Sequence, residues 1–176
     1  DTGNGRRWGY RAGERFPMCS TFKLLAAAGV LARVDQRRES LERRVAIERS
    51  ALVSYSPVTE PRAGGTMTLA ELCEAAVTLS DNTAGNLILT SLGGPQGLTD
   101  FARSLGDSVT RLDRWETALN EATPGDPRDT TSPDAMSTTV AALVNGGRLS
   151  QGATAQLVSW MVSSKTGDAK LRAGLP

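Results

Sequence analysis

Histidine is absent from this sequence, and its absence excludes several kinds of active site. None of the 176 residues is histidine, and only two, Cys19 and Cys73, are cysteine. Without imidazole there is no Ser-His-Asp triad, no Cys-His dyad and no histidine-ligated zinc. Two cysteines are also too few for a thiolate metal site or a disulfide framework. We therefore expect no metal and no cofactor, and a hydrolase of this composition needs Lys, Glu, Asp or Tyr as its base.

The sequence also lacks a strong net charge and a long apolar run. Its 20 basic and 19 acidic side chains give a formal net charge of +1, which creates no field to hold a phosphate backbone, so we expect no nucleic-acid partner. The longest apolar run, residues 24–32, is about half of what a membrane span needs. Residues 1–5 have no apolar core like that of a signal peptide. With 39% apolar residues, the composition is typical of a globular domain.

Apolar spacing predicts a mainly helical chain. Helices are expected at residues 20–34, 69–80, 83–92, 95–106, 133–145 and 151–163, and strands only at 6–11 and 45–47. The sequence Thr68-Leu69-Ala70-Glu71 is typical of a capping box. Residues 107–131, with little apolar periodicity, predict a long ordered loop. Because two short strands are marginal by themselves, the chain is either nearly all helical or part of a larger protein.

The segment Ser20-Thr21-Phe22-Lys23 opens the first apolar helix. Residues three apart share a helix face, so the Ser20 hydroxyl and the Lys23 amine are expected to lie side by side. A buried lysine with a lowered pKa can take the proton of a hydroxyl nucleophile, and the helix N-terminus favours a developing oxyanion. Alone, this spacing is more typical of an N-cap serine followed by a solvated lysine.

A second polar motif, Ser80-Asp81-Asn82, lies between two predicted helices. Each of these residue types also caps helices well, so the motif by itself indicates only a helix start. Together, however, S-x-x-K and a later S-D-N are the signature of class A β-lactamases and penicillin-binding proteins. The absence of histidine agrees with a serine enzyme of that kind.

Over nearly its whole length the sequence resembles class A serine β-lactamases. The likeness is carried by residues 15–23, 54–58, 80–82 with Asn86, and 114–121, the last similar to that family's omega loop. It implies an α+β fold of the serine β-lactamase and penicillin-binding-protein type, represented mainly by its all-helical domain. In this interpretation residues 1–19 are a strand remnant of the α/β domain, 20–163 are the helical domain with an omega loop at about 111–129, and 164–176 lead back to a sheet that this chain lacks.

The resemblance assigns a role to each matching residue. Ser20 is the nucleophile, Ser80 relays a proton, and the acylation base is either Lys23 or Glu116 acting through water. Glu116 also activates the hydrolytic water. Substrate-binding roles fall on Tyr55, Asn82 and Asn120, and structural roles near the site on Asn86, Arg114 and Asp129. The last two are expected to pair at the neck of the loop, and the Glu116-Thr117 peptide is expected to be cis.

The resemblance implies a monomeric bacterial enzyme, periplasmic or secreted, that acts on small β-lactams. Two alternatives are a penicillin-binding protein or DD-peptidase-like protein that acylates and stays acylated, and an inactive fragment of a β-lactamase. Lys165-Thr166-Gly167 looks like the family's third motif, but residues 163–176 lack strand alternation, so we expect a helix end and a loop there. The true motif would then follow Pro176. We expect Cys19 to be a small buried residue and Cys73 a free buried thiol.

Overall fold

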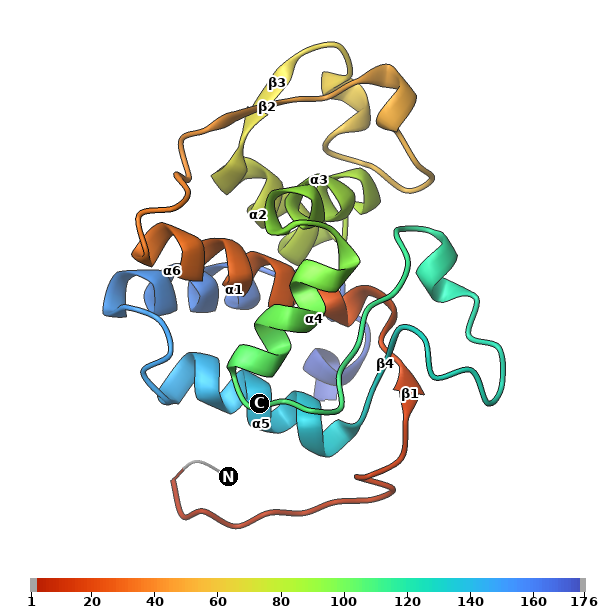
Figure 1. Cartoon of the computed structure of the whole chain (residues 1–176), viewed down its shortest axis with the longest axis vertical. Helices are drawn as coiled ribbons and strands as arrows, with labels where there is room; N and C mark the ends of the chain where they lie inside the picture. Colours follow the sequence, from red (N-terminus) through yellow and green to blue (C-terminus); the bar gives the residue numbers. More distant parts are fainter. Residues whose placement is uncertain (1–2, 175–176) are drawn as a thin grey trace.

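The computed structural model describes residues 3–174 and is built mainly from helices (Figure 1). In chain order its α-helices and strands are β1 (Phe16–Pro17), α1 (Phe22–Asp35), β2 (Arg44–Ala46), β3 (Thr66–Thr68), α2 (Leu69–Leu79), α3 (Asn82–Leu92), α4 (Pro95–Ser104), β4 (Thr130–Thr131), α5 (Pro133–Asn145) and α6 (Gln151–Val162). Short 3-10 helices occur at Cys19–Thr21, Arg49–Ala51, Glu60–Arg62, Ala118–Asn120 and Leu171–Gly174. No helix in the described part of the chain is long and apolar enough to cross a membrane.

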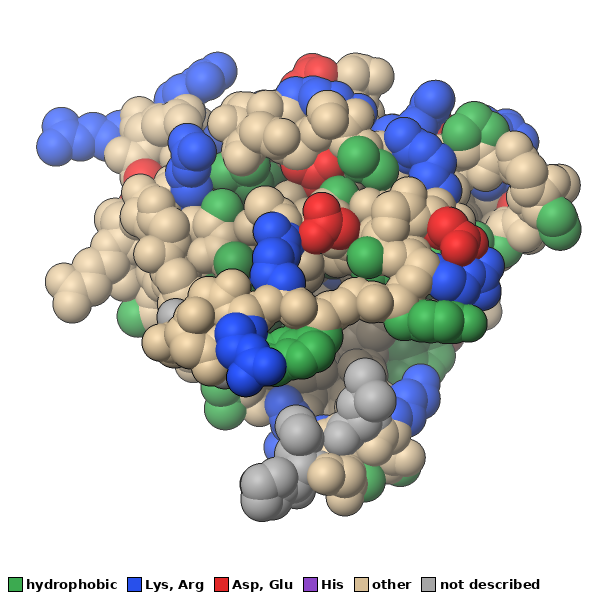
Figure 2. All heavy atoms as spheres, turned by 90° about the horizontal axis from the view of Figure 1, so that it is seen from below, with side chains coloured by type: hydrophobic (Ala, Val, Ile, Leu, Met, Phe, Trp, Pro, Cys, Tyr) green, Lys and Arg blue, Asp and Glu red, His purple; other side chains and the backbone are tan. Residues whose placement is uncertain are grey.

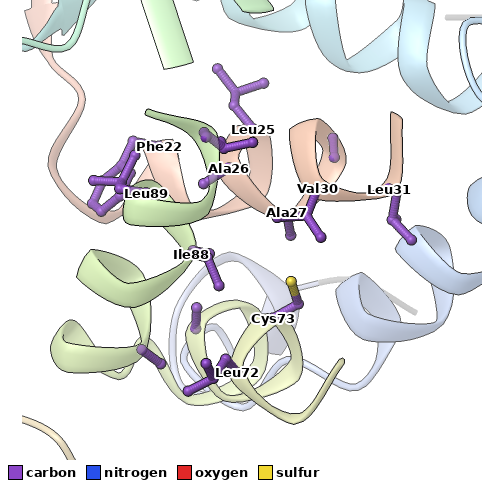
Figure 3. Close-up of a cluster of buried hydrophobic side chains, with 14 of the residues drawn as sticks. Phe22, Leu25, Ala26, Ala27, Val30, Leu31, Leu72, Cys73, Ile88 and Leu89 are labelled. Atoms are coloured by element: carbon purple, nitrogen blue, oxygen red, sulfur yellow. The ribbon is translucent and has the colours of Figure 1, made fainter. Parts of the chain in front are cut away.

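Helix α1 forms the centre of the molecule and packs against α2, α3, α4 and α6. Its middle is the sequence Leu25-Ala26-Ala27-Ala28-Gly29-Val30-Leu31, all of it buried. A helix that is apolar around most of its circumference is stable only when other elements surround it. Small residues allow close approach: a Cβ on Gly29 would lie 3.1 Å from a methyl carbon of Leu92. Figure 3 shows these side chains meeting Leu72, Cys73, Ile88 and Leu89 of α2 and α3.

Side-chain caps define where the helices begin. Thr68 and Glu71 form the predicted capping box of α2, and Asp81, Ser132 and Ser150 each accept a backbone N–H at the start of α3, α5 and α6. Such caps satisfy N–H groups that have no partner within the helix. All six predicted helices are present, with ends within about two residues of the sequence prediction.

The strands form two short antiparallel pairs. Strand β2 pairs with β3, with Val45 opposite Met67, and β1 pairs with β4, with Phe16 opposite Thr131. An isolated bridge between Arg111 and Thr130 extends the second pair. The bridge joins the two ends of the 107–131 loop, and β1–β4 pairing holds the C-terminal end of this loop against the segment that leads to Ser20.

Two sequence predictions are wrong. Residues 6–11 form no strand, and Trp8 and Tyr10 are exposed, because a strand needs a partner and none of the described segments pairs with this one. Cys19 is exposed rather than buried, since it lies at the start of a tight turn with a φ of 45°. Cys73 is free and buried as predicted, and burial raises the pKa of its thiol.

One further prediction is confirmed at the end of α6. Residues 165–167 lie in a turn after α6 and not in a strand. On the face in Figure 2, basic side chains are separated by acidic, polar and apolar ones and do not gather in one basic patch.

Candidate active site

Ser20 and Lys23 lie at the N-terminal end of the central helix. Ser20 belongs to the 3-10 turn Cys19–Thr21, Lys23 to the first turn of α1, and Lys23 Nζ is 3.1 Å from Ser20 Oγ. Lys23 is 1% exposed. A facing glycine makes room for its side chain, because a Cβ on Gly85 of α3 would lie 3.0 Å from Lys23 Cε. The predicted proximity of hydroxyl and amine is therefore present, in a buried setting rather than a solvated one.

The ammonium of Lys23 is surrounded by oxygen atoms from three parts of the chain. Besides Ser20 Oγ, Nζ lies 2.8 Å from Ser80 O, 3.1 Å from Ser80 Oγ and 2.6 Å from Asn82 Oδ1. It is also 3.2 Å from Glu116 Oε1. An ammonium has three hydrogens, so these five oxygens exceed what it can serve at once. Burial lowers the pKa of Lys23, while Glu116 and Asp81 oppose that effect by favouring the charged form.

Ser80 and Asn82 reach Lys23 because the chain turns sharply between α2 and α3. Ser80 adopts a left-handed φ of 58°, and Asn82 is the first residue of α3. The Asn82 side chain accepts from Lys23 through Oδ1 and donates through Nδ2 to Ser54 O at 2.8 Å. Because Nδ2 carries two hydrogens, one of them remains to donate to a ligand.

Glu116 approaches Lys23 from the 107–131 loop. Its side chain is buried, and Oε2 accepts from Asn120 Nδ2 at 2.6 Å. Oε1 accepts no hydrogen bond from any described residue, although it faces the Lys23 ammonium. Asn86 of α3 holds the backbone on both sides: its Oδ1 accepts from Glu116 N at 2.9 Å, and its Nδ2 donates to Glu116 O at 3.1 Å. The Glu116-Thr117 peptide is cis, as predicted.

The neck of this loop is closed by the predicted pair of Arg114 and Asp129. Arg114 Nε lies 2.6 Å from Asp129 Oδ2, and the amides of Asp113 and Arg114 donate to Asp129 Oδ1 at 2.7 and 2.9 Å. Arg114 also pairs with Glu121 across the loop. Because the Asp129 carboxylate is buried and accepts three hydrogen bonds, this pair is more than a surface contact.

An open cleft of about 510 Å³ lies beside Ser20. The cleft is lined by Ser20, Tyr55, Ser80, Asn82, Asn120, Thr166 and Lys170. A more apolar cavity of about 440 Å³ adjoins it on the other side of Ser20. Lys23 and Glu116 lie beneath the cleft and are not among its lining residues, while Asn86, Arg114 and Asp129 hold the loop from behind.

Thr166 and Lys170 are cleft residues that the sequence analysis did not identify. The sequence analysis set Lys165-Thr166-Gly167 aside as a look-alike of the family's third motif and interpreted residues 164–176 as a connection, so it placed neither residue at the cleft. The placement comes from a tertiary contact, in which Lys165 N donates to Thr78 O at 2.9 Å and holds the segment beside α2. In the described part of the chain, no three His, Cys, Asp or Glu side chains gather as they do around a metal ion.

Chemically, the arrangement brings together a hydroxyl, an amine and a carboxylate below an open cleft, through a hydrogen bond from Lys23 to Ser20 and an ion pair between Lys23 and Glu116. A hydroxyl 3.1 Å from a buried amine is within range for proton transfer. The carboxylate and amide of Glu116 and Asn120, joined at 2.6 Å, are suited to orienting a water molecule. Such a set can form a covalent bond to an acyl group and then transfer that group to water.

Comparisons with known proteins agree with one another. A family model described as the beta-lactamase enzyme family matches residues 1–176. An ancestral class A beta-lactamase is 64% identical, with a TM-score of 0.98, and the match covers 100% of this chain and 68% of that one. The class A beta-lactamase of the last common ancestor of Gram-negative bacteria is 63% identical (TM-score 0.98, 100% and 67% covered). The putative class A beta-lactamase PenP from Rhodopseudomonas palustris is 61% identical (TM-score 0.98, 100% and 67% covered).

Proposed function

The chain belongs to the beta-lactamase enzyme family, and from this membership we propose the function that its cleft supports best: hydrolysis of β-lactams through an acyl-enzyme on Ser20. The fold is that of class A enzymes. One observation carries the assignment of residues: Lys23 Nζ lies 3.1 Å from Ser20 Oγ and 3.2 Å from Glu116 Oε1. Nucleophile and both candidate bases thus belong to one connected set.

Acylation begins when Ser20 Oγ attacks the β-lactam carbonyl and loses its proton. Lys23 can take that proton directly when its amine is neutral, a form that burial favours. Glu116 can take it through a water molecule, since its Oε1 accepts no hydrogen bond from the described residues. Both routes remain open. The 3-10 turn that precedes α1 supplies the Ser20 backbone N–H to the developing oxyanion.

Opening the ring requires a proton for the departing nitrogen, and Ser80 is the proposed donor. Its Oγ lies 3.1 Å from Lys23 Nζ and lines the cleft, so it connects the ammonium to the substrate side. The remaining Nδ2 hydrogen of Asn82 is directed to the acylamide of the substrate. Tyr55, with its side chain exposed in the cleft, borders the bound ring system.

Deacylation separates this proposal from its alternative. A penicillin-binding protein acylates and stays acylated, so it has no need of a second base. Glu116 and Asn120, joined at 2.6 Å, favour a hydrolase, because together they orient the water that cleaves the ester. The two hydrogen bonds between the Asn86 side chain and the Glu116 backbone support the same role, because they fix the position of that carboxylate.

The complete protein should therefore turn over a chromogenic cephalosporin many times per active site. Absorbance measures turnover, and intact mass measures the covalent species present at each time. A stable one-to-one adduct without turnover would replace the hydrolase with the acylating alternative. Absence of both adduct and turnover would remove the proposal altogether.

We also propose the wider setting that family membership suggests. The substrate is a small β-lactam, the protein is a monomer, and it acts in the periplasm or outside a bacterial cell. Residues 20–163 form the helical domain, with the omega loop at 111–129. Sedimentation checks the monomer, and fractionation of expressing cells checks the compartment.

A further inference from the structure

We propose that Trp115 is a positioning residue for Glu116, and that its indole does this by packing against Gly94 in the turn between α3 and α4. The inference rests on the proposed function, because that proposal assigns the activation of water to Glu116. Gly94 has no side chain and takes part in no chemical step, so its effect on the reaction acts entirely through Trp115.

The indole of Trp115 lies unusually close to Gly94. A Cβ on Gly94 would lie 3.2 Å from Cζ2 of the indole and 3.6 Å from Cη2. Non-bonded carbon atoms are most stable about 3.5–4.0 Å apart, so any side chain at this position would displace the ring. Gly94 also has φ and ψ angles of 84° and −167°, which are open to glycine and strained for other residues. Glycine is therefore needed both for the turn and for the approach of the ring.

Gly94 is a fixed support because both neighbouring helices hold its backbone. Gly94 N donates to Leu89 O at 2.8 Å, which joins it to the last turn of α3. Leu98 N donates to Gly94 O at 3.3 Å, which joins it to the first turn of α4. The backbone beneath the indole is thus held from both sides. A clash at this contact is relieved most easily by movement of Trp115, whose side chain is 41% exposed.

Movement of Trp115 reaches Glu116 directly, because the two residues share a peptide bond. Trp115 O accepts from Leu119 N at 3.0 Å, so residues 115–119 form one turn around the glutamate. Leu119 is 0% exposed and anchors the far end of this turn in the core. The indole on Gly94 anchors the near end. A displacement of about 1 Å in a catalytic group can cost about 10²-fold in rate, so this second anchor matters for the chemistry.

The effect should fall on deacylation more than on acylation. Deacylation uses the pair of Glu116 and Asn120, which is joined at 2.6 Å and moves with the turn. Acylation can also proceed through Lys23, which lies 3.1 Å from Ser20 Oγ and belongs to α1. A contact that only stabilises the fold would lower the free energy of unfolding without separating the two rates.

The experiment is a double-mutant cycle with Gly94→Ala and Trp115→Leu in the complete protein. Rapid mixing with a penicillin and intact mass give the rates at which the adduct forms and decays. Each single variant should slow deacylation about tenfold and acylation no more than about threefold. The double variant should be within about threefold of the slower single variant, because the alanine then has no indole to displace. Backbone strain at residue 94 is the same in both backgrounds and cancels from the cycle.

Gly93→Ala is the matched control. Gly93 is the neighbouring residue and has a φ of 95°, but a Cβ there would meet nothing within 4 Å. This variant introduces backbone strain into the same turn and leaves the indole in place, so deacylation should stay within about threefold of the parent. The fluorescence of Trp115 gives a readout that needs no activity. It is isolated by subtracting the spectrum of the same protein with Trp115→Leu, and its quenching by acrylamide should rise in Gly94→Ala and stay unchanged in Gly93→Ala.

Three results would overturn the proposal: deacylation losses that multiply in the double variant, equal losses in Gly93→Ala and Gly94→Ala, or acylation slowed as much as deacylation. If Gly94→Ala does not fold, Trp115→Leu must still slow deacylation about tenfold and leave acylation within about threefold, and parent-like deacylation refutes the role of Trp115. If the parent has no β-lactam activity, the proposed function fails. Acrylamide quenching alone then decides whether Gly94 supports the indole, and equal quenching in Gly94→Ala and the parent rules that support out.

Discussion

Replacing Glu116 by glutamine separates the two halves of the proposed reaction with almost no change in shape. In the parent, Oε2 accepts from Asn120 and Oε1 faces the Lys23 ammonium at 3.2 Å. Glutamine can keep its oxygen toward Asn120 only by turning its NH2 group toward Lys23. The variant therefore loses the carboxylate that would activate water, and the Lys23 ammonium loses its contact with an anion.

The expected kinetic effect falls mainly on deacylation. Loss of a general base typically slows a step by about 10²–10⁴-fold, which corresponds to roughly 3–5 kcal/mol of barrier. Acylation should slow much less, because Lys23 stays 3.1 Å from Ser20 Oγ and becomes neutral more readily without the nearby carboxylate. Because the second step then limits turnover, the acyl-enzyme should accumulate on nearly every Ser20.

The effect on stability should be small. Removing one partner of a buried ion pair often costs about 3–5 kcal/mol, because the other charge is left alone. Here Lys23 retains Ser80 O at 2.8 Å and Asn82 Oδ1 at 2.6 Å, and Glu116 Oε1 forfeits no hydrogen bond. We therefore expect a loss of less than about 2 kcal/mol in the free energy of unfolding, measured in urea.

The assay is rapid mixing with a penicillin, quenching at intervals, and intact mass. Glu121→Gln is the matched control: this carboxylate is five residues along the same loop, is exposed and pairs with Arg114. The deacylation rate of Glu121→Gln should stay within about tenfold of the parent's, because the loss of a surface ion pair costs about 1 kcal/mol at most. Parent-like turnover by Glu116→Gln, with no trapped adduct, would refute the assignment of Glu116 as the water-activating base.

Four further predictions concern other residues. Ser20→Ala should form no adduct with a penicillin by intact mass, and Lys23→Ala should acylate at least about 10²-fold more slowly, because the base or its relay is lost. Burial raises the pKa of Asp107, but hydrogen bonds from Thr110, Val109 N and Thr139 outweigh this and lower it overall. Asp107 therefore contributes stability at pH values above its unfolded pKa of about 3.9, and this contribution is lost as pH falls through the folded pKa. In urea unfolding, the free energy of unfolding of Asp107→Asn should fall furthest below that of the parent at pH 7 and less far below it at pH 3. Ile88 is fully buried between α1 and α2, so Ile88→Ala should lower the free energy of unfolding by about 2–5 kcal/mol. A urea midpoint equal to that of the parent would contradict the packing in Figure 3.

The features that can be predicted from the sequence are those determined by local interactions. Helix ends were predictable because Thr68, Ser132 and Ser150 cap the turns that they precede. The pairs Ser20–Lys23 and Glu116–Asn120 were predictable because residues three or four apart on one turn must meet. Motif spacing then linked the two pairs, although nothing in the sequence alone gives the 3.2 Å between Lys23 and Glu116.

Non-local contacts account for what was missed. A strand at residues 6–11 required a neighbour that composition does not reveal, and strands of two or three residues such as β1 and β4 leave almost no periodic signal. Lys170 reaches the cleft through the docking of its segment beside α2, across about ninety residues of chain. The exposure of Cys19 follows from its backbone turn and not from its residue type.

Helix α3 carries residues that contact the groups of both proposed chemical steps. Asn82, its first residue, touches Lys23, and Asn86, one turn later and about 6 Å along the axis, holds the backbone of Glu116. A tilt of α3 would move the groups proposed for acylation and those proposed for deacylation together, so we expect altered packing beneath α3 to change both rates in a correlated way. A substitution in the 107–131 loop or at residues 53–59 can therefore change one of the two rates and leave the other unchanged. Because substitutions in α3 change both, α3 is the part of the site whose sequence is least free to change.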